Sequence, residues 1–155
     1  MKVESPGTLF VVKTAYKIRA MKLADYAPVY RLWRETKEVV LVEDDSRAGI
    51  KLYLSRNPGL CFVATVGVKI VGTALCGHDG RRGILRHLAV RPEFRKQGIG
   101  RALVQKCLDG LAKQGIRKCN IFVMDYNKAG LRWWKSLGGV QHTYDWRTVQ
   151  MPTGR

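Results

Sequence analysis

The sequence predicts a single α/β domain in which helices flank a central, largely antiparallel sheet. Two observations favour this class. Strand-like alternation and helix-like spacing of apolar residues follow one another along the chain, and 155 residues are enough to bury one core without disulfides. Residues 1–15 precede the first strand-like pattern and contain Ser5-Pro6-Gly7. We therefore expect a flexible extension over residues 1–15 and one domain over residues 16–155.

Five apolar segments bounded by turn-forming residues predict the strands of this sheet. The second and third flank Gly67 and predict a hairpin, and Pro92 follows the fourth, because proline cannot continue a ladder of hydrogen bonds. The predicted strands are residues 16–21, 61–66, 69–76, 82–90 and 117–124, with one or two terminal strands after residue 137.

Helix signals lie between the strands. The first helix is expected from about Asp25, whose carboxylate can cap it. The second is expected from near Asp45-Ser46 to Asn57-Pro58-Gly59, which is a strong helix breaker. Helical spacing of apolar residues also predicts a third helix from about residue 98 and a short fourth one from about 128 to 137.

The segment Arg95-Lys96-Gln97-Gly98-Ile99-Gly100 joins the fourth predicted strand to the third helix. Gly98 and Gly100 allow the backbone to approach a ligand closely. The first turn of the helix offers unpaired N–H groups and the positive end of the helix dipole, which both favour an anion. Arg95, Lys96 and Arg101 add positive charge. The segment therefore predicts a loop that holds a pyrophosphate.

Two other phosphate-binding motifs are excluded. The G-x-x-x-x-G-K-[ST] loop of nucleotide hydrolases is absent, and the dinucleotide fingerprint would need a third glycine where Leu103 stands. The loop is therefore of a different kind.

The stretches "RHLAVRPEFRKQGIGRALV" and "IFVMDYNKAGLRWWKSLGG" resemble the GNAT superfamily of acetyl-CoA-dependent N-acetyltransferases, over about residues 16–151. This resemblance implies a three-layer fold whose mixed, mostly antiparallel sheet splays apart between its fourth and fifth strands, with a bulge near Leu88–Val90. It also implies contacts with acetyl-CoA, the acetyl donor, from Leu88, Ala89, Val90, Arg95, Lys96, Gln97, Gly98, Ile99, Gly100, Arg101, Asn127 and Trp134.

The reaction implied by the resemblance is direct attack of a neutral primary amine on the acetyl thioester in a ternary complex. An N–H of the bulged strand would polarise the carbonyl oxygen. Two positions depart from the family pattern. Trp134 stands where a tyrosine often protonates the leaving thiolate, and Arg86 stands where a glutamate is often found, so neither usual acid nor usual base can be carried over.

Three explanations for these missing groups stay open. The acid and base come from elsewhere, or water carries the proton because a thiol is a tolerable leaving group, or the protein binds acetyl-CoA with little transfer. The first explanation has candidates on the loop before the second helix and near the fourth helix. These candidates are Tyr126, Tyr144 and Glu43, with Asp125, Asp44 and Asp45 beside them.

The chain carries 28 lysines and arginines against 12 acidic residues, a formal charge of +16. This charge favours an anionic partner, and acetyl-CoA accounts for part of it. The remainder could attract nucleic acid, a ribosome or an acidic substrate, or form a solvated surface. A basic acyl-CoA sensor or RNA-associated module with little transfer is therefore the alternative function.

Composition also limits cofactors and location. No metal is expected, because His78, His87 and His142 are scattered and the four cysteines lack C-x-x-C spacing, which instead favours reduced, buried thiols. No apolar run approaches the length of a membrane span or a signal-peptide core, so we expect a cytoplasmic protein that does not bind membranes. The acceptor is expected to be a small-molecule or peptide amine, and the protein a monomer or homodimer.

Overall fold

The computed structural model describes residues 13–143 and 148–153. The chain divides into two compact units, Met1–Phe122 and Val123–Arg155. The predicted extension lies mostly outside the described residues, as does Tyr144.

A five-stranded sheet forms the centre of the first unit, in the order β1-β2-β3-β4-β5. The first four strands pair antiparallel with their neighbours, and β4 pairs parallel with β5. This arrangement confirms the predicted mixed, mostly antiparallel sheet. The strands are β1 (Lys17–Ala20), β2 (Phe62–Val66), β3 (Lys69–His78), β4 (Gly83–Val90) and β5 (Cys119–Ile121).

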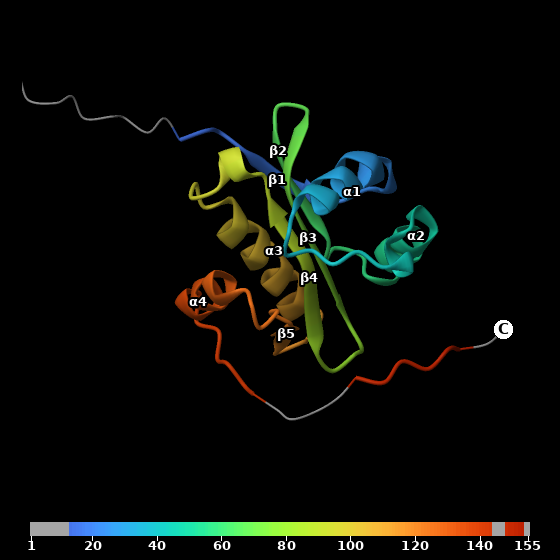
Figure 1. The fold of residues 1–155 in the computed structure, drawn as a ribbon. Helices are drawn as coiled ribbons and strands as arrows, with labels where there is room; N and C mark the ends of the chain where they lie inside the picture. Colours follow the sequence, from blue (N-terminus) through green and yellow to red (C-terminus); the bar gives the residue numbers. More distant parts are fainter. Residues whose placement is uncertain (1–12, 144–147, 154–155) are drawn as a thin grey trace, which may run out of the picture. The chain divides into compact units, whose positions relative to one another are not determined.

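Helices cover both faces of this sheet (Figure 1). On one face, α1 (Tyr26–Glu35) and α2 (Arg47–Arg56) contribute Trp33 and Ile50 to a buried apolar cluster with strand residues. On the other face lies α3 (Ile99–Lys113). A Cβ at Gly72 of β3 would meet side-chain atoms of Leu103 and Ile99 at 3.1 and 3.2 Å, so glycine there allows α3 to lie close to the sheet.

Each of the first two helices follows a 3₁₀ turn, η1 (Leu23–Asp25) before α1 and η2 (Glu43–Asp45) before α2. Ser46 caps α2 by accepting a hydrogen bond from the Gly49 amide at 3.2 Å. The expectation that Asp25 caps α1 is wrong. Its carboxylate instead accepts the Lys22 amide and the Arg19 guanidinium, which draw it back toward the preceding strand.

The last two strands of the sheet separate after a short paired stretch. Pairing between β4 and β5 runs only from Gly83↔Cys119 to Leu85↔Ile121, so in the described part of the chain residues 86–90 have no partner strand on that side. The predicted splay is therefore present, but β5 is shorter than the predicted strand 117–124 because β4 diverges from it.

A bulge in β4 coincides with this divergence. Thr73 of β3 pairs with Ala89, and Leu75 pairs with Arg86, so His87 and Leu88 both stand opposite Ala74. His87 has φ 50, in the left-handed region that residues other than glycine rarely adopt. The bulge thus begins one residue before the predicted range 88–90.

The second unit contains α4 (Lys128–Ser136). Asn127 caps this helix by accepting a hydrogen bond from the Gly130 amide at 2.8 Å, as its sequence position suggests. The described residues 137–143 and 148–153 contain no strand, contrary to the predicted terminal strands. No ladder partner is recorded for these segments, and their apolar side chains Val140, Val149 and Met151 are exposed.

The four cysteines are free thiols. Cys61, Cys76 and Cys107 are buried as expected, whereas Cys119 is only partly buried. Burial raises the pKa of the Cys61 thiol to about 11, which keeps it protonated and unreactive near neutral pH.

Candidate functional site

The loop between β4 and α3 has the backbone geometry of an anion site. Gly98 stands at the N-cap of α3 with φ 87, and no side chain caps the helix. Lys96 also has a positive φ, 59. Among the described residues, no hydrogen-bond acceptor is recorded for the backbone N–H groups from Lys96 to Arg101. These donors and the helix dipole are therefore available to a negatively charged ligand.

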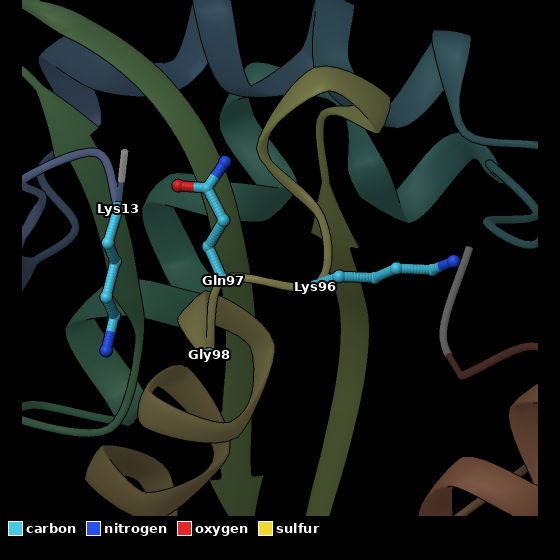
Figure 2. Close-up of a pocket in the computed structure, with 4 residues that line it drawn as sticks. All are labelled: Lys13, Lys96, Gln97 and Gly98. Atoms are coloured by element: carbon cyan, nitrogen blue, oxygen red, sulfur yellow. The ribbon is translucent and has the colours of Figure 1, made fainter. Parts of the chain in front are cut away.

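An open pocket of about 420 Å³ lies at this loop, lined by Lys13, Lys96, Gln97 and Gly98. Figure 2 shows Lys13 and Lys96 on opposite sides of Gln97, with Gly98 at the start of the helix. The Gln97 side chain accepts a hydrogen bond from the Thr14 amide at 3.2 Å, which joins the segment before β1 to the loop. Lys13 was not foreseen from the sequence, because it lies in the predicted extension and belongs to no local motif.

The other predicted donor-binding residues of the first unit fall into two groups. Ile99 and Ala89 are buried, so they can serve a ligand only through their backbone, whereas Leu88 and Val90 are half-buried. Arg101 is exposed at the start of α3. Arg95 donates from Nε to the Val90 carbonyl at 2.9 Å, so its side chain braces the end of β4.

The unpaired half of β4 offers a second binding feature. Residues 86–90 lack a neighbour on the β5 side, so backbone groups there are free to pair with an extended ligand, much as with an added strand. The loop follows this open strand edge in the chain after one 3₁₀ turn, η3 (Pro92–Phe94). A ligand that combines a phosphate group with an amide-containing arm matches both features.

A histidine and an aspartate meet at the bulge. His87 Nε2 lies 2.7 Å from Asp45 Oδ1, and the two side chains retain only 14% and 9% exposure. The Trp33 ring contacts the His87 ring edge-on, with centroids 4.8 Å apart. In the sequence, Asp45 is a candidate beside Glu43 and marks the expected start of the second helix, and His87 is one of three scattered histidines. No local signal joins two residues 42 positions apart.

Asp45 is held by more than the histidine. Its Oδ2 accepts the Val42 amide at 2.9 Å, and its backbone carbonyl accepts the Tyr26 hydroxyl at 2.9 Å. Burial raises the pKa of Tyr26, and the neighbouring Tyr30 and Asp45 raise it further, so this phenol stays a neutral donor. Glu43 and Asp44 of the same turn are exposed.

The remaining predicted residues lie in the second unit or outside the described chain. Tyr126 is exposed, Asn127 caps α4, and Trp134 is half-buried with its ring edge-on to Trp133 at 4.8 Å. Tyr144 lies outside the described residues. The role of each in chemistry stays a prediction.

The described residues contain neither a metal-binding cluster nor a helix that could span a membrane. No group of three or more His, Cys, Asp or Glu side chains within residues 13–143 and 148–153 is arranged to hold a metal ion. No helix in those ranges is long and apolar enough to cross a membrane.

Known proteins share this sequence and architecture. Residues 26–138 match the model of the Acetyltransferase (GNAT) family. Acetyltransferase YE1169 of Yersinia enterocolitica is 33% identical over 121 residues, which are 78% of this chain and 85% of the relative. Acetyltransferase ECA0875 of Pectobacterium atrosepticum is 32% identical over the same shares of the two chains.

Solved structures show the same fold at lower identity. The PaiA N-acetyltransferase of Thermoplasma acidophilum, in complex with coenzyme A, has a TM-score of 0.72 at 19% identity, covering 84% of this chain and 94% of that chain. The ribosomal-protein-S18-alanine N-acetyltransferase of Escherichia coli has a TM-score of 0.67 at 24% identity, covering 83% and 80%. With the family match and the curated relatives, these likenesses establish that the chain belongs to the acetyltransferase (GNAT) family and is an acyltransferase.

Proposed function

We propose that the protein transfers an acetyl group from acetyl-CoA to a primary amine by direct attack in a ternary complex. The observation that carries this proposal is the junction of β4 and α3, where an open strand edge leads into a loop of unpaired amides. Acetyl-CoA has matching parts in the same order, an amide-containing pantetheine arm and a pyrophosphate.

The pyrophosphate would bind at the start of α3. Amides of Gly98, Ile99 and Gly100 lack recorded acceptors among the described residues, and Lys13 and Lys96 bring positive charge to the same pocket. Charge-assisted hydrogen bonds to phosphate are stronger than those between neutral groups. This arrangement holds the donor by its charged end.

The pantetheine arm would extend along residues 88–90 of β4. Its amides would pair with strand groups that β5 leaves free, and an N–H at the bulge would donate to the thioester oxygen as negative charge develops there. The resemblance assigns Asn127 and Trp134 to the donor as well. The sidechain of Trp134 would pack against it, because an indole cannot protonate the leaving thiolate.

In the reaction, the neutral amine nitrogen attacks the carbonyl carbon and forms the new C–N bond. The nitrogen gives up one proton, the C–S bond breaks, and its electron pair stays on the coenzyme A sulfur. A thiolate whose thiol has a pKa of about 8.5 to 9 leaves without an obligatory protein acid. Tyr126 and Tyr144 remain candidates for that acid and Glu43 for a base.

The alternative proposal is a basic acyl-CoA-binding module with little transfer. The formal charge of +16 supports it, because a donor loop uses only a few of the 28 basic residues. Such a protein would bind acetyl-CoA and a polyanion such as RNA, and would form no acetylated amine.

Calorimetric titration with acetyl-CoA, followed by release of free coenzyme A thiol over a panel of amines, tests the proposal. The panel contains alkylamines, a polyamine, amino acids, an aminoglycoside and short peptides. Donor binding together with thiol release that depends on one amine would support transfer. Binding without turnover on any amine would favour the alternative, and no binding would contradict both.

A further inference from the structure

We propose that His87 is the general base of the acetyl transfer and that Asp45 is the residue that positions it. This inference rests on the proposed function and supplies a base where Arg86 cannot serve. It assigns roles to a pair that the local sequence pattern does not reveal.

The first argument is position. His87 is the first residue of the β4 bulge, one residue before the segment 88–90 along which the thioester arm is proposed to bind. Asp45 comes from the turn between α1 and α2. The pair therefore joins the proposed donor strand to the turn that also carries Glu43, the other candidate base.

The second argument is which nitrogen is available. Asp45 as a carboxylate can only accept, so His87 Nε2 carries the proton that bridges them at 2.7 Å, and Nδ1 keeps its lone pair. No hydrogen bond to Nδ1 is recorded among the described residues. Within that part of the chain, the buried side-chain nitrogen and oxygen atoms without a partner are Trp33 Nε1 and Thr73 Oγ1. Nδ1 is not one of them, and the His87 side chain is 14% exposed.

The third argument is restraint. Asp45 is fixed by the Val42 amide and Tyr26 hydroxyl, and the His87 ring is fixed by Asp45 on one side and by Trp33 on another. The His87 backbone adopts a φ of 50, a strained conformation that is found most often at functional positions.

The proton has a complete path in this scheme. As the amine attacks the thioester carbonyl, the nitrogen loses one proton to His87 Nδ1, and the resulting imidazolium is stabilised by Asp45 through Nε2. The C–S electron pair leaves on sulfur as a thiolate. The imidazolium then releases its proton to solvent, which restores the base.

The surroundings contain few other groups that titrate. Around the bulge, η2 contributes Asp45, α1 contributes Tyr26 and Tyr30, and α2 contributes Arg47, whose charge acts on Tyr26. The β3 residues opposite the bulge, 73–75, do not titrate, and Arg86 is exposed on β4 itself.

Three matched variants test the proposal with the full chain and the amine that gives the fastest thiol release in the panel. His87→Gln retains a donor near the Nε2 position but has no base. Asp45→Asn keeps the shape, but its amide would donate to Nε2 and move the imidazole proton to Nδ1. His78→Gln is the control, because both nitrogens of His78 are already engaged, with Gln114 and with the Gly80 amide.

We expect kcat to fall about 100-fold in His87→Gln, in line with the usual contribution of general bases. Acetyl-CoA affinity, measured by calorimetry, should change less than about threefold. In the wild type, kcat/KM should rise with pH along a limb that His87→Gln abolishes. Asp45→Asn should also lower kcat. The double variant Asp45→Asn/His87→Gln should have the same kcat as His87→Gln alone, because Asp45 acts through His87.

Two results would overturn the proposal. One is a His87→Gln variant that binds acetyl-CoA normally and keeps kcat within about threefold of the wild type or of His78→Gln. The other is absence of transfer by the wild-type protein on every amine, which removes the proposed function and the role of His87 with it. A His87→Gln variant that fails to bind acetyl-CoA would show that the pair maintains the fold, and would also contradict a catalytic role.

Discussion

Two aspartates occupy equivalent places before the first two helices, but one pairs with an arginine and the other with a histidine. Asp25 and Asp45 each end a 3₁₀ turn that precedes a helix, and each carboxylate accepts the backbone amide three residues earlier, at 2.8 and 2.9 Å. The side chain that pairs with each carboxylate differs. Asp25 binds Arg19 on β1, whose side chain is 42% exposed, whereas Asp45 binds the enclosed His87 on the β4 bulge.

The partner of the aspartate decides whether this 3₁₀-turn motif can serve only structure or also chemistry. An arginine does not give up its proton near neutral pH, so the bidentate Arg19–Asp25 pair can only hold β1 to the start of α1. A histidine can exchange its proton, and within residues 13–143 and 148–153 the structure shows no hydrogen bond to the second nitrogen of His87. We therefore expect Asp25 to matter for stability and Asp45 for turnover.

Both aspartates are compared in a protein that must first bind acetyl-CoA. The largest effect of any substitution is therefore expected on acetyl-CoA affinity. Gly98→Glu should weaken acetyl-CoA binding more than about 100-fold, because it puts a negative side chain against the phosphate site and strains a position with φ 87. Calorimetry measures the loss. Gly98→Ala is the control, since it shares the strain at φ 87 but adds no charge, and its Cβ would meet nothing closer than the Tyr16 hydroxyl at 3.7 Å. Unchanged affinity in a folded Gly98→Glu protein would remove the loop from the donor site.

The two aspartates are compared most directly by the kcat of their asparagine variants, which have nearly the same shape. Asp45→Asn should lower kcat by about 30-fold or more, whereas Asp25→Asn should leave it within about threefold. Thiol release at saturating acetyl-CoA provides both values. Equal losses in the two variants would mean that both aspartates act only through the fold.

Trp134→Phe should reduce turnover by less than about tenfold, which is roughly 1.4 kcal/mol, because the indole is proposed only to pack against the donor. Steady-state kinetics at saturating donor provide the test. A much larger loss of kcat with unchanged acetyl-CoA affinity would show that Trp134 has a role in chemistry.

The smallest effect is expected when the Arg19–Asp25 pair is broken, and it is an effect on the free energy of unfolding. The hydrogen bond from Arg19 holds the pKa of Asp25 below its usual value, and the Lys22 amide contributes. Folding is therefore stabilised above the unfolded-state pKa near 3.8, and this stabilisation is lost as pH falls through the lower folded-state pKa. Arg19→Gln should cost about 1 kcal/mol at pH 7, an amount limited by the exposure of Arg19.

Urea unfolding at pH 7, 5, 4 and 3 measures this contribution. The cost of Arg19→Gln should shrink toward pH 3 as Asp25 becomes protonated in the wild type. A cost that stays constant down to that pH would mean that the arginine stabilises the fold through packing of its carbon chain.

Local patterns in the sequence were sufficient to predict the start of α3 and most other elements, and they also predict that the loop before α3 binds the donor. Gly98, the charged residues around it and the apolar stripe that begins at Ile99 are contiguous, so their spacing predicts a helix start that binds anions. Ser46 and Asn127 cap their helices for the same local reason. Such features depend on residues close together in the chain.

The His87–Asp45 pair could not be found this way, because it depends on register. A bulge inserts one residue into β4 and changes which side chains face α1, and apolar alternation does not show where this happens. The sequence pattern does not predict the length of β5 for a related reason. Residues 122–124 have strand-like composition, yet the strand ends where β4 diverges. Long-range geometry decides both features.

One measurement tests the central claim most directly. It is mass-spectrometric detection of the acetylated amine formed from acetyl-CoA, with wild-type protein and His87→Gln compared at saturating donor and equal pH. Steady formation of the acetylated product by the wild type, about 100-fold slower in His87→Gln, is the predicted result. Equal rates for the two proteins would contradict the assignment of the base, and no acetylated product from the wild type on any amine would contradict the transfer itself.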